Sequence, residues 1–279
     1  MDEKKGRRSA RPADRKKILA DPDQGRVDTT VKKAITLFEF LAASDIPLGV
    51  SALSKHFNLQ KSNVHRLLNT LSILGYVRQD IETKRYLPTL RVWEVGSDIV
   101  QRDALRVAAR PILKELYQAT GRSVFISVLS GTHILYLDTI DFLESPQLGP
   151  QSGGRVPAAY PASGKAILAH QSDPASALER VIAAFPQAVD LDRAALLKEF
   201  KTIREQGYAV TVNGWRKGSS SLAAPILTPG YPANAAIGVA GVSEQLPQRQ
   251  ILKFAQTVMT AARRISELRV RASVTSWEQ

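Results

Sequence analysis

The stretch between residues 50 and 75 constrains the fold most, because two helical patterns are separated there by a very short turn. A short helix is predicted around Ser51–Phe57, and the tight turn Asn58-Leu59-Gln60 follows it. A longer helix is predicted from about Lys61 to Leu74, where Gly75 can end it in a left-handed conformation. The apolar residues of this longer helix are predicted to share one face: Val64, Leu67, Leu68, Leu71 and Leu74. Two helices of this kind need a third element to cover their apolar faces.

The residues before and after this stretch are predicted to form the elements that pack on these apolar faces. Asp28 or Thr29 can cap a first helix that ends before the Pro47-Leu48-Gly49 break. Its apolar residues are predicted to form one buried stripe: Val31, Ala34, Ile35, Phe38, Leu41 and Ala42. After Gly75, two short strands at Tyr76–Arg78 and Arg85–Leu87 flank a polar turn. Three helices and a hairpin around one small core form a winged helix-turn-helix, which we assign to residues 28–88.

The polar side of the longer helix predicts contact with duplex DNA. In a helix-turn-helix, the first turns of the second helix enter the major groove. Asparagine can pair with adenine and arginine with guanine, each good pair giving about 1–3 kcal/mol of discrimination, so Asn63 and Arg66 are the candidates for base contacts. The full set of candidate DNA-binding residues is Ser51, Gln60, Lys61, Ser62, Asn63, His65, Arg66, Arg78, Lys84 and Arg85. The alternative is an ordinary solvated polar face.

The distribution of charge agrees with a polyanionic partner. The chain has 279 residues, a formal charge of +12 and a pI near 10.0. Residues 1–88 hold 17 Lys/Arg and 10 Asp/Glu, whereas residues 89–279 hold 21 and 16, so the basic density is N-terminal. Bulk charge alone does not separate nucleic acid from an anionic membrane surface. We interpret residues 1–27 as a disordered basic arm, which either contacts DNA through Arg7, Arg8, Arg11 and Lys16 or is a solvated tail.

Several classes of protein are disfavoured by what the sequence lacks. There is no cysteine, which excludes disulfides and thiolate metal sites. No secretory signal or long apolar run is recognisable, so we expect a cytoplasmic protein without a membrane partner. His56 and His65 lie on different predicted helices with no third ligand nearby, and we therefore expect no metal and no cofactor.

Beyond the wing, the chain is predicted to connect to a larger domain of mixed structure. Residues 89–110 have helical spacing and are assigned to a connector helix, a kind of element through which dimers often pair. We assign residues 111–272 to the second domain and residues 273–279 to a tail. Helices are expected at 166–170, 175–185, 191–206 and 248–268; strands are expected from 123, at 133–140, 208–212, 222–226 and 235–242. The fold class is therefore α+β.

At this point the residues resemble a known family. The run LSKHFNLQKSNVHRLLNTL, residues 53–71, with Gly75-Tyr76-Val77 is similar to the winged helix-turn-helix of IclR-type bacterial regulators. Further motifs are similar to the effector domain of that family: Gly154-Arg155-Val156-Pro157, Ser163-Gly164-Lys165-Ala166, Ile203-Arg204 with Gly207-Tyr208, Gly218, and Ala223-Ala224-Pro225-Ile226. The resemblance covers about residues 28–270. It implies a GAF-like effector-binding domain with an antiparallel sheet and a small-molecule pocket on one side.

The resemblance also implies positions for the pocket. The candidate effector-binding residues are Val156, Ala162, Ser163, Thr211, Ser219, Ser221, Gly238 and Ala240. The chain differs from relatives at Thr211–Trp215, where acidic character is lost, and at Gly238 and Ala240, where two hydroxyl donors are lost. We therefore expect room for a bulkier, partly apolar ligand such as an aromatic acid, held by the hydroxyls of Ser163, Ser219 and Ser221. The alternative is that these small residues only serve strand packing.

Three function classes come into question for such a chain. A ligand-responsive DNA-binding transcriptional regulator of a catabolic operon explains both domains. An enzyme is disfavoured, because no nucleophile elbow, paired-histidine zinc motif or dinucleotide fingerprint occurs, and Ser163-Gly164-Lys165-Ala166 lacks the glycine that a phosphate loop requires. A nonspecific DNA-binding protein without a sensed ligand explains the charge but not the second domain. We expect a homodimer on an inverted-repeat operator, and the resemblance implies that dimers pair into tetramers.

Overall fold

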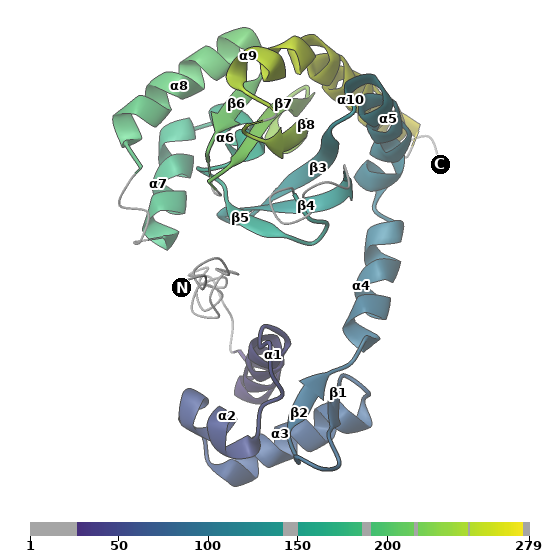
Figure 1. The fold of residues 1–279 in the computed structure, drawn as a ribbon, viewed down its shortest axis with the longest axis vertical. Coiled ribbons are helices and arrows are strands. Elements are labelled where there is room, and N and C mark those ends of the chain that lie inside the picture. Colours follow the sequence, from purple (N-terminus) through teal and green to yellow (C-terminus); the bar gives the residue numbers. More distant parts are fainter. Residues whose placement is uncertain (1–26, 142–149, 186–190, 215–216, 245, 276–279) are drawn as a thin grey trace. The chain divides into compact units, whose positions relative to one another are not determined.

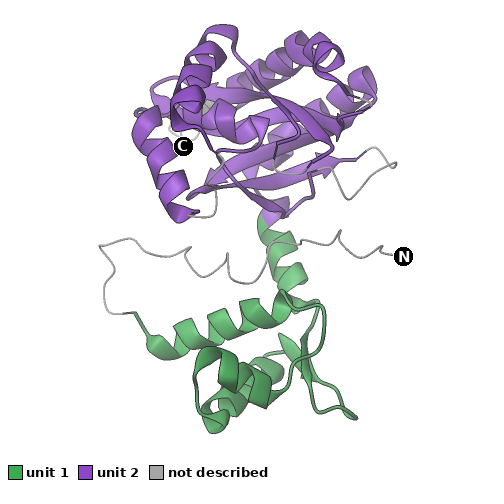
Figure 2. Ribbon diagram, turned by 60° about the vertical axis from the view of Figure 1, so that its left-hand side comes forward, with its two compact units in different colours: residues 1–99 green, residues 100–279 purple. Residues whose placement is uncertain are grey.

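A computed structural model describes residues 27–141, 150–185, 191–214, 217–244 and 246–275. The chain divides into two compact units, residues 1–99 and 100–279, which are coloured separately in Figure 2. Residues 1–26 of the arm assigned to 1–27, and residues 276–279 of the tail assigned to 273–279, lie outside the described residues.

The first unit is a winged helix-turn-helix. Its elements are the helices α1 (Thr29–Ala42), α2 (Val50–Phe57) and α3 (Lys61–Ile73), the antiparallel strands β1 (Val77–Gln79) and β2 (Tyr86–Pro88), and most of α4 (Arg91–Gln101). Asp28 caps α1 by accepting bonds from the backbone N–H groups of Thr30 and Val31, at 2.7 and 3.1 Å. The core of this unit joins all three helices to both strands: Leu37, Leu41, Leu53, Val64, Leu67, Leu68, Val77 and Tyr86 are buried.

The predicted apolar stripe of α1 is wrong in part. Val31 and Ile35 are 55% and 54% exposed, and Ala42 is also exposed. The buried residues are Leu37 and Leu41, which lie one turn apart. The face that packs on the core therefore runs through these two residues, while the first turn of the helix is exposed. Several overlapping apolar stripes can be drawn on α1, and only contact with α2, α3 and the wing selects one.

Leu74 is a second correction. It was expected on the buried face of α3, but α3 ends at Ile73 and Leu74 is its C-cap, with 58% of its surface exposed. Gly75 follows with a φ of +77°, as expected for a residue that turns the chain out of a helix. The helix thus ends one residue before the apolar pattern does.

The second unit is a six-stranded antiparallel sheet covered by helices on both faces. The strand order is β5 (Arg155–Pro157), β4 (His133–Ile140), β3 (Ser123–Ser130), β8 (Tyr231–Val242), β7 (Ser219–Thr228) and β6 (Ala209–Val212). The helices α5 (Ala104–Thr120) and α10 (Ala255–Thr275) pack on one face. The helices α6 (Ala162–Ala169), α7 (Pro174–Ala184) and α8 (Arg193–Gln206) lie on the other face, and the short α9 (Gln248–Ile251) leads towards α10 (Figure 1). This arrangement confirms the predicted α+β class with an antiparallel sheet.

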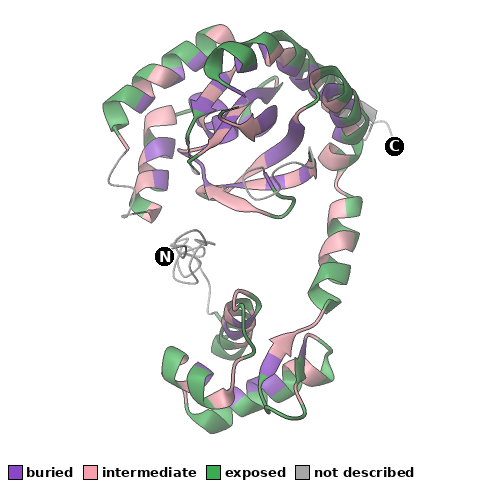
Figure 3. Ribbon diagram, viewed as in Figure 1, coloured by how far each residue is buried: buried purple, intermediate pink, exposed green. Residues whose placement is uncertain are grey.

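Some element bounds differ from the predictions. Helix α6 starts at Ala162 rather than Ala166, although Gly164 lies within it. Glycine fits there because a Cβ at Gly164 would come 1.9 Å from the carbonyl oxygen of Ala158. Strands β7 and β8 extend to a turn around Pro229-Gly230, because hydrogen bonding between them sustains residues that are weak strand formers in isolation. Figure 3 shows the buried residues concentrated on this sheet, whereas α4 has no buried residue.

Candidate nucleic-acid interface and ligand pocket

Helix α3 separates its side chains by chemistry. Val64, Leu67 and Leu68 are buried and anchor the helix to the core. The polar candidates at its N-terminal end are all exposed: Lys61, Ser62, Asn63, His65 and Arg66. A helix held from behind by aliphatic side chains can present this edge rigidly to a groove.

The start of α3 is also suited to an anionic partner. Asn58 ends α2 in a left-handed conformation with a φ of 50°, and the hydroxyl of Ser54 donates to the carbonyl oxygen of Leu59 at 2.6 Å, which fixes the turn. The N-cap residue Gln60 is exposed and its side chain makes no capping bond, so it does not satisfy the first N–H groups of α3. No acidic residue occurs in the sequence between Asp45 and Asp80. The helix dipole and the local charge therefore favour phosphate here.

The wing is held in shape by its own turn. A carboxylate oxygen of Asp80 accepts bonds from the backbone N–H of Thr83 at 2.8 Å and from its hydroxyl at 2.7 Å. These bonds hold the pKa of Asp80 below its usual value. Lys84 adopts a φ of +56°, and Arg78, Lys84 and Arg85 are all exposed. The hairpin lies beside α3 (Figure 1), so a rigid basic element accompanies the polar edge. Ser51, the remaining candidate, is exposed near the start of α2.

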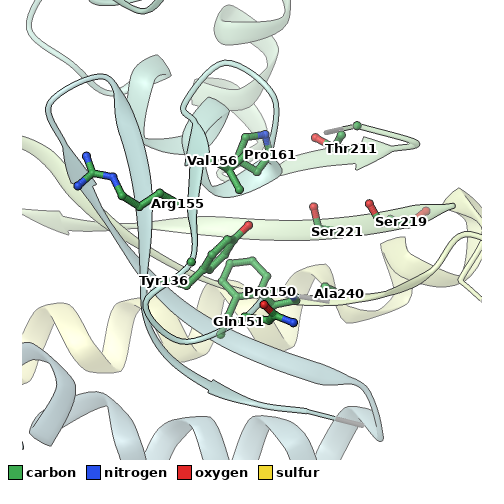
Figure 4. Close-up of a pocket in the computed structure, with 14 residues that line it drawn as sticks. Tyr136, Pro150, Gln151, Arg155, Val156, Pro161, Thr211, Ser219, Ser221 and Ala240 are labelled. Carbon is green, nitrogen blue, oxygen red and sulfur yellow. The ribbon is translucent and has the colours of Figure 1, made fainter. Parts of the chain in front are cut away.

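A pocket opens in the second unit on the face of the sheet that α6 covers (Figure 4). Five of the predicted effector-binding residues line it: Val156, Thr211, Ser219, Ser221 and Ala240. In Figure 4 the hydroxyls of Ser219 and Ser221 point from β7 to the same side of the sheet. The remaining candidates, Ala162, Ser163 and Gly238, are buried and do not belong to the lining.

The space expected at Gly238 is already filled. A Cβ at this position would lie 2.3 Å from the carbonyl oxygen of Leu222 and 2.6 Å from Cζ of Phe125. The expectation that Gly238 leaves room for a bulkier ligand is therefore wrong, because the ring of Phe125 occupies that room. Ala240, in contrast, is 6% exposed and does line the pocket.

Ser163 does not hold its hydroxyl in the pocket lining. The side chain is fully buried in the first turn of α6, and its Oγ has no hydrogen-bond partner among the described residues. Leaving a buried hydroxyl unpaired costs about 1–3 kcal/mol. Pro161, the N-cap of α6, is the part of this helix that borders the pocket.

The sequence reasoning missed the aromatic floor of the pocket. Phe125 of β3 and Tyr136 of β4 lie edge to face, with ring centroids 5.3 Å apart and planes at 84°. Strand alternation could have placed both residues on one face, but the pairing of β3 with β4 contains a bulge that alternation does not reveal. Arg155 also borders the pocket, yet its guanidinium donates to the carbonyl oxygen of Ser130 at 3.2 Å and points away from the serines (Figure 4). Among the described residues, the rest of the lining is apolar or hydroxylated apart from the amide of Gln151, and it includes no acidic side chain.

Metal binding finds no support in the described part of the chain. No group of three or more histidine or acidic side chains is placed to hold an ion there. His56 stacks on Phe40 with centroids 3.8 Å apart, while His65 is exposed on α3. Within the same ranges, no helix combines the length and the apolar character that a membrane crossing would need.

Comparison with known families decides the classification. The model of the bacterial transcriptional regulator IclR C-terminal domain matches residues 97–267, and the IclR helix-turn-helix domain matches residues 30–80. The chain belongs to the IclR family. Members of this family are DNA-binding transcriptional regulators with an effector-binding C-terminal domain, not enzymes, and this chain is therefore an IclR-type regulator.

Individual relatives are distant but match nearly end to end. The chain is 27% identical over 263 residues to the HTH-type transcriptional regulator BhcR of Paracoccus denitrificans, covering 93% of this chain and 94% of the relative. The crystal structure of an IclR family regulator from Brucella abortus matches with a TM-score of 0.74 at 21% identity, over 93% and 99% of the chains. An IclR homologue from Microbacterium hydrocarbonoxydans, solved in complex with 4-hydroxybenzoate, matches with a TM-score of 0.70 at 21% identity, over 88% and 100%.

Proposed function

We propose that this IclR-type regulator reads a specific operator through the N-terminal end of α3. Its proposed effector, which changes its DNA binding, is an aromatic or other partly apolar acid. The observation that carries the proposal is the pocket, whose described lining combines two aromatic rings with serine and threonine hydroxyls and includes no acidic side chain. Control of an operon for the breakdown of that acid is the simplest role for such a sensor.

The operator would be read by the exposed edge of α3. Asn63 and Arg66 are proposed to contact base edges, because their amide and guanidinium groups match the donors and acceptors of adenine and guanine. The other candidates are proposed to hold phosphates: Ser51, Gln60, Lys61, Ser62, His65, Arg78, Lys84 and Arg85. A dimer would place two such edges about 34–36 Å apart on an inverted repeat.

The effector is proposed to lie over Phe125 and Tyr136 with its polar end towards the hydroxyls. Aromatic rings favour edge-to-face and offset contacts with other rings, which supports a planar ligand. Ser219 and Ser221 contribute hydroxyls to the lining, and Val156 and Ala240 complete the apolar wall. The hydroxyl of Thr211 donates to the carbonyl oxygen of Tyr160 at 3.4 Å, so it is proposed to accept a bond from the ligand. The homologue crystallised with 4-hydroxybenzoate makes this compound the first to titrate.

Pairing of the chain is proposed to involve the first unit. Val31 and Ile35 on α1, and Leu90 and Trp93 at the start of α4, are 54–76% exposed, although all are large and apolar. Soluble monomers rarely leave such side chains uncovered in groups, so a second copy is the proposed cover. Sedimentation of the full chain, compared with a Trp93→Lys variant, would test this pairing and any further association of dimers into tetramers.

The proposed function is tested by selecting a DNA site and by measuring the binding of small acids to the protein in a calorimeter. The full chain is used to select a binding site from a pool of random DNA, and its affinity for that site is measured with and without 4-hydroxybenzoate. We expect one selected inverted repeat and a change in affinity of about tenfold on adding the acid. Tight binding of glyoxylate or pyruvate, with no binding of aromatic acids, would contradict the proposed ligand class.

A nonspecific DNA-binding protein without a ligand is the competing function. It predicts equal affinity for the selected site and for random DNA, with the same steep dependence on salt for both. A preference of at least a thousandfold for the selected site at physiological salt would exclude it.

A further inference from the structure

A buried carboxylate joins the sheet of the second unit to the helix through which the chain arrives from the first unit. Asp138 of β4 has a side chain only 7% exposed, and Nε of Arg106 lies 3.1 Å from its Oδ2. Arg110 forms an ion pair with the same oxygen through Nη1. Arg106 and Arg110 are one turn apart on α5. One carboxylate therefore holds that turn both in its rotation about the helix axis and in its position along the axis.

A β-bulge places this carboxylate next to the pocket. Ile126 of β3 pairs with Asp138, and the next residue, Ser127, pairs with Tyr136, which leaves Leu137 as the extra residue. Tyr136 therefore faces the pocket while Leu137 packs into the cluster beneath α5 and α10. Within three consecutive residues, β4 passes from the floor of the pocket to the ion pairs on the opposite face of the sheet. Bulges interrupt the ladder and let a strand adjust locally, so this point can respond to what lies on Tyr136.

Helix α5 is divided at the same level by a proline. Pro111 has no N–H to donate to the carbonyl oxygen of Val107, so the regular bonding of the helix is interrupted there. After the proline, Ile112, Leu113 and Leu116 are buried in the core. Before the proline, Ala109 is buried and Leu105 packs against the core, but Val107 is exposed, and Arg106 and Arg110 pair with Asp138. Asp138 therefore adds a polar attachment to a segment with fewer buried side chains than the part after the proline. Interrupted helices bend at such points.

We infer that Asp138 is a positioning residue that transmits occupancy of the pocket from Tyr136 to the segment 104–110, and through it to the DNA-binding unit. This inference rests on the proposed function, because it assumes that the pocket takes an effector. A ligand over Tyr136 shifts the bulge, the carboxylate moves with it, and the two arginines carry the segment 104–110 about Pro111. The part of α5 after the proline stays with the core.

The first test uses Asp138→Asn, which keeps the shape of the side chain and removes its charge. The matched control is Glu115→Gln, which removes another acid–arginine pair from the same helix after the proline, where Nη2 of Arg264 lies 3.2 Å from Oε1 of Glu115. In the full chain, we expect 4-hydroxybenzoate to change the DNA affinity of the wild type and of Glu115→Gln by about tenfold, and that of Asp138→Asn by less than about twofold. The affinity for 4-hydroxybenzoate itself stays within about threefold of the wild type in both variants, which a merely structural loss would not produce. A full response in Asp138→Asn, or an equal loss in the control, overturns the inference.

The second test needs no ligand. Hydrogen exchange of the full chain is expected to accelerate about tenfold in residues 104–110 of Asp138→Asn and to stay unchanged in residues 112–120. Unchanged exchange in residues 104–110 overturns the inference. If Asp138→Asn does not fold, Arg110→Gln takes its place in both tests, since that side chain is 44% exposed, and a full response to the ligand in this variant overturns the inference equally. If the wild type ignores 4-hydroxybenzoate, this compound is not the effector, and the first test is repeated with the acid that changes its DNA affinity. The exchange experiment meanwhile decides whether Asp138 holds the segment 104–110 in place.

Discussion

The two functional surfaces of this regulator are built in different ways. The edge of the first unit that we propose reads DNA comes from one helix and the residue next to it, so its candidates from Gln60 to Arg66 are neighbours in sequence. The pocket of the second unit collects residues between Phe125 and Ala240 from several strands and loops. A surface on one helix follows from periodicity, whereas a pocket depends on how strands pair across long separations. Variants that affect one surface and leave the other intact test this contrast.

Removal of a core side chain from the first unit should separate the two surfaces most strongly. Leu68 is fully buried beneath the polar edge, and Leu68→Ala is expected to lower the free energy of unfolding of the first unit by about 2–5 kcal/mol. Leu74→Ala is the matched control and should change it by less than about 0.5 kcal/mol, since Leu74 is 58% exposed. Calorimetric unfolding would show this, with ligand binding retained in both variants. Equal losses in the two variants would mean that α3 is not anchored as described.

Adding a side chain at Gly238 should destabilise the second unit. Gly238→Val is expected to cost about 1–3 kcal/mol or more in the unfolding of the second unit, because the new Cβ meets the backbone of Leu222 as well as the ring of Phe125. Ala240→Val adds its methyl groups beside the pocket and should cost less while weakening ligand affinity. Chemical denaturation followed by a titration with 4-hydroxybenzoate checks both. If Gly238→Val is as stable as the wild type, Phe125 does not fill this space.

Loss of one proposed base contact should weaken DNA binding and leave the pocket unchanged. Arg66→Ala is expected to cost about 1–3 kcal/mol on the selected site, or roughly five- to 150-fold in affinity, and to leave ligand affinity unchanged. Lys33→Ala, which removes an exposed cation from α1, is the control and should have little effect. Mobility-shift titration measures both. Unchanged affinity in Arg66→Ala would refute the assignment of the α3 edge.

The smallest effect is expected when the pH is lowered. Burial lowers the pKa of His170 in the second unit, and the nearby Arg204 lowers it further. Because the folded pKa lies below the unfolded value of about 6.5, the unfolded chain binds more protons just below that pH. The stability of the second unit should therefore be full above pH 6.5 and fall as the pH drops towards the folded pKa. Thermal unfolding of the wild type and His170→Gln at pH 7.0 and 5.5 measures the effect, and equal pH dependence in the two proteins would contradict it.

The success of the sequence reasoning followed the range of the interactions involved. The exposure of Lys61, Asn63 and Arg66 was predictable, because the aliphatic residues of the same helix leave them no other direction. The exposure of Val31 and Leu74 was not, because the choice among apolar stripes is made by neighbouring elements. In the pocket, Ser219 and Ser221 were found through family motifs, while Phe125 and Tyr136 were missed.

Helix periodicity and turn chemistry were thus enough to establish the winged helix-turn-helix, its polar edge and the mixed nature of the second unit. Three-dimensional packing alone established that Phe125 fills the space beside Gly238, that Ser163 is buried outside the pocket lining, and that a bulge turns Asp138 towards α5. The physical reason is the distance along the chain over which each feature is specified. A helix face is fixed by residues three and four apart, whereas strand register and the filling of a cavity depend on residues more than a hundred positions away.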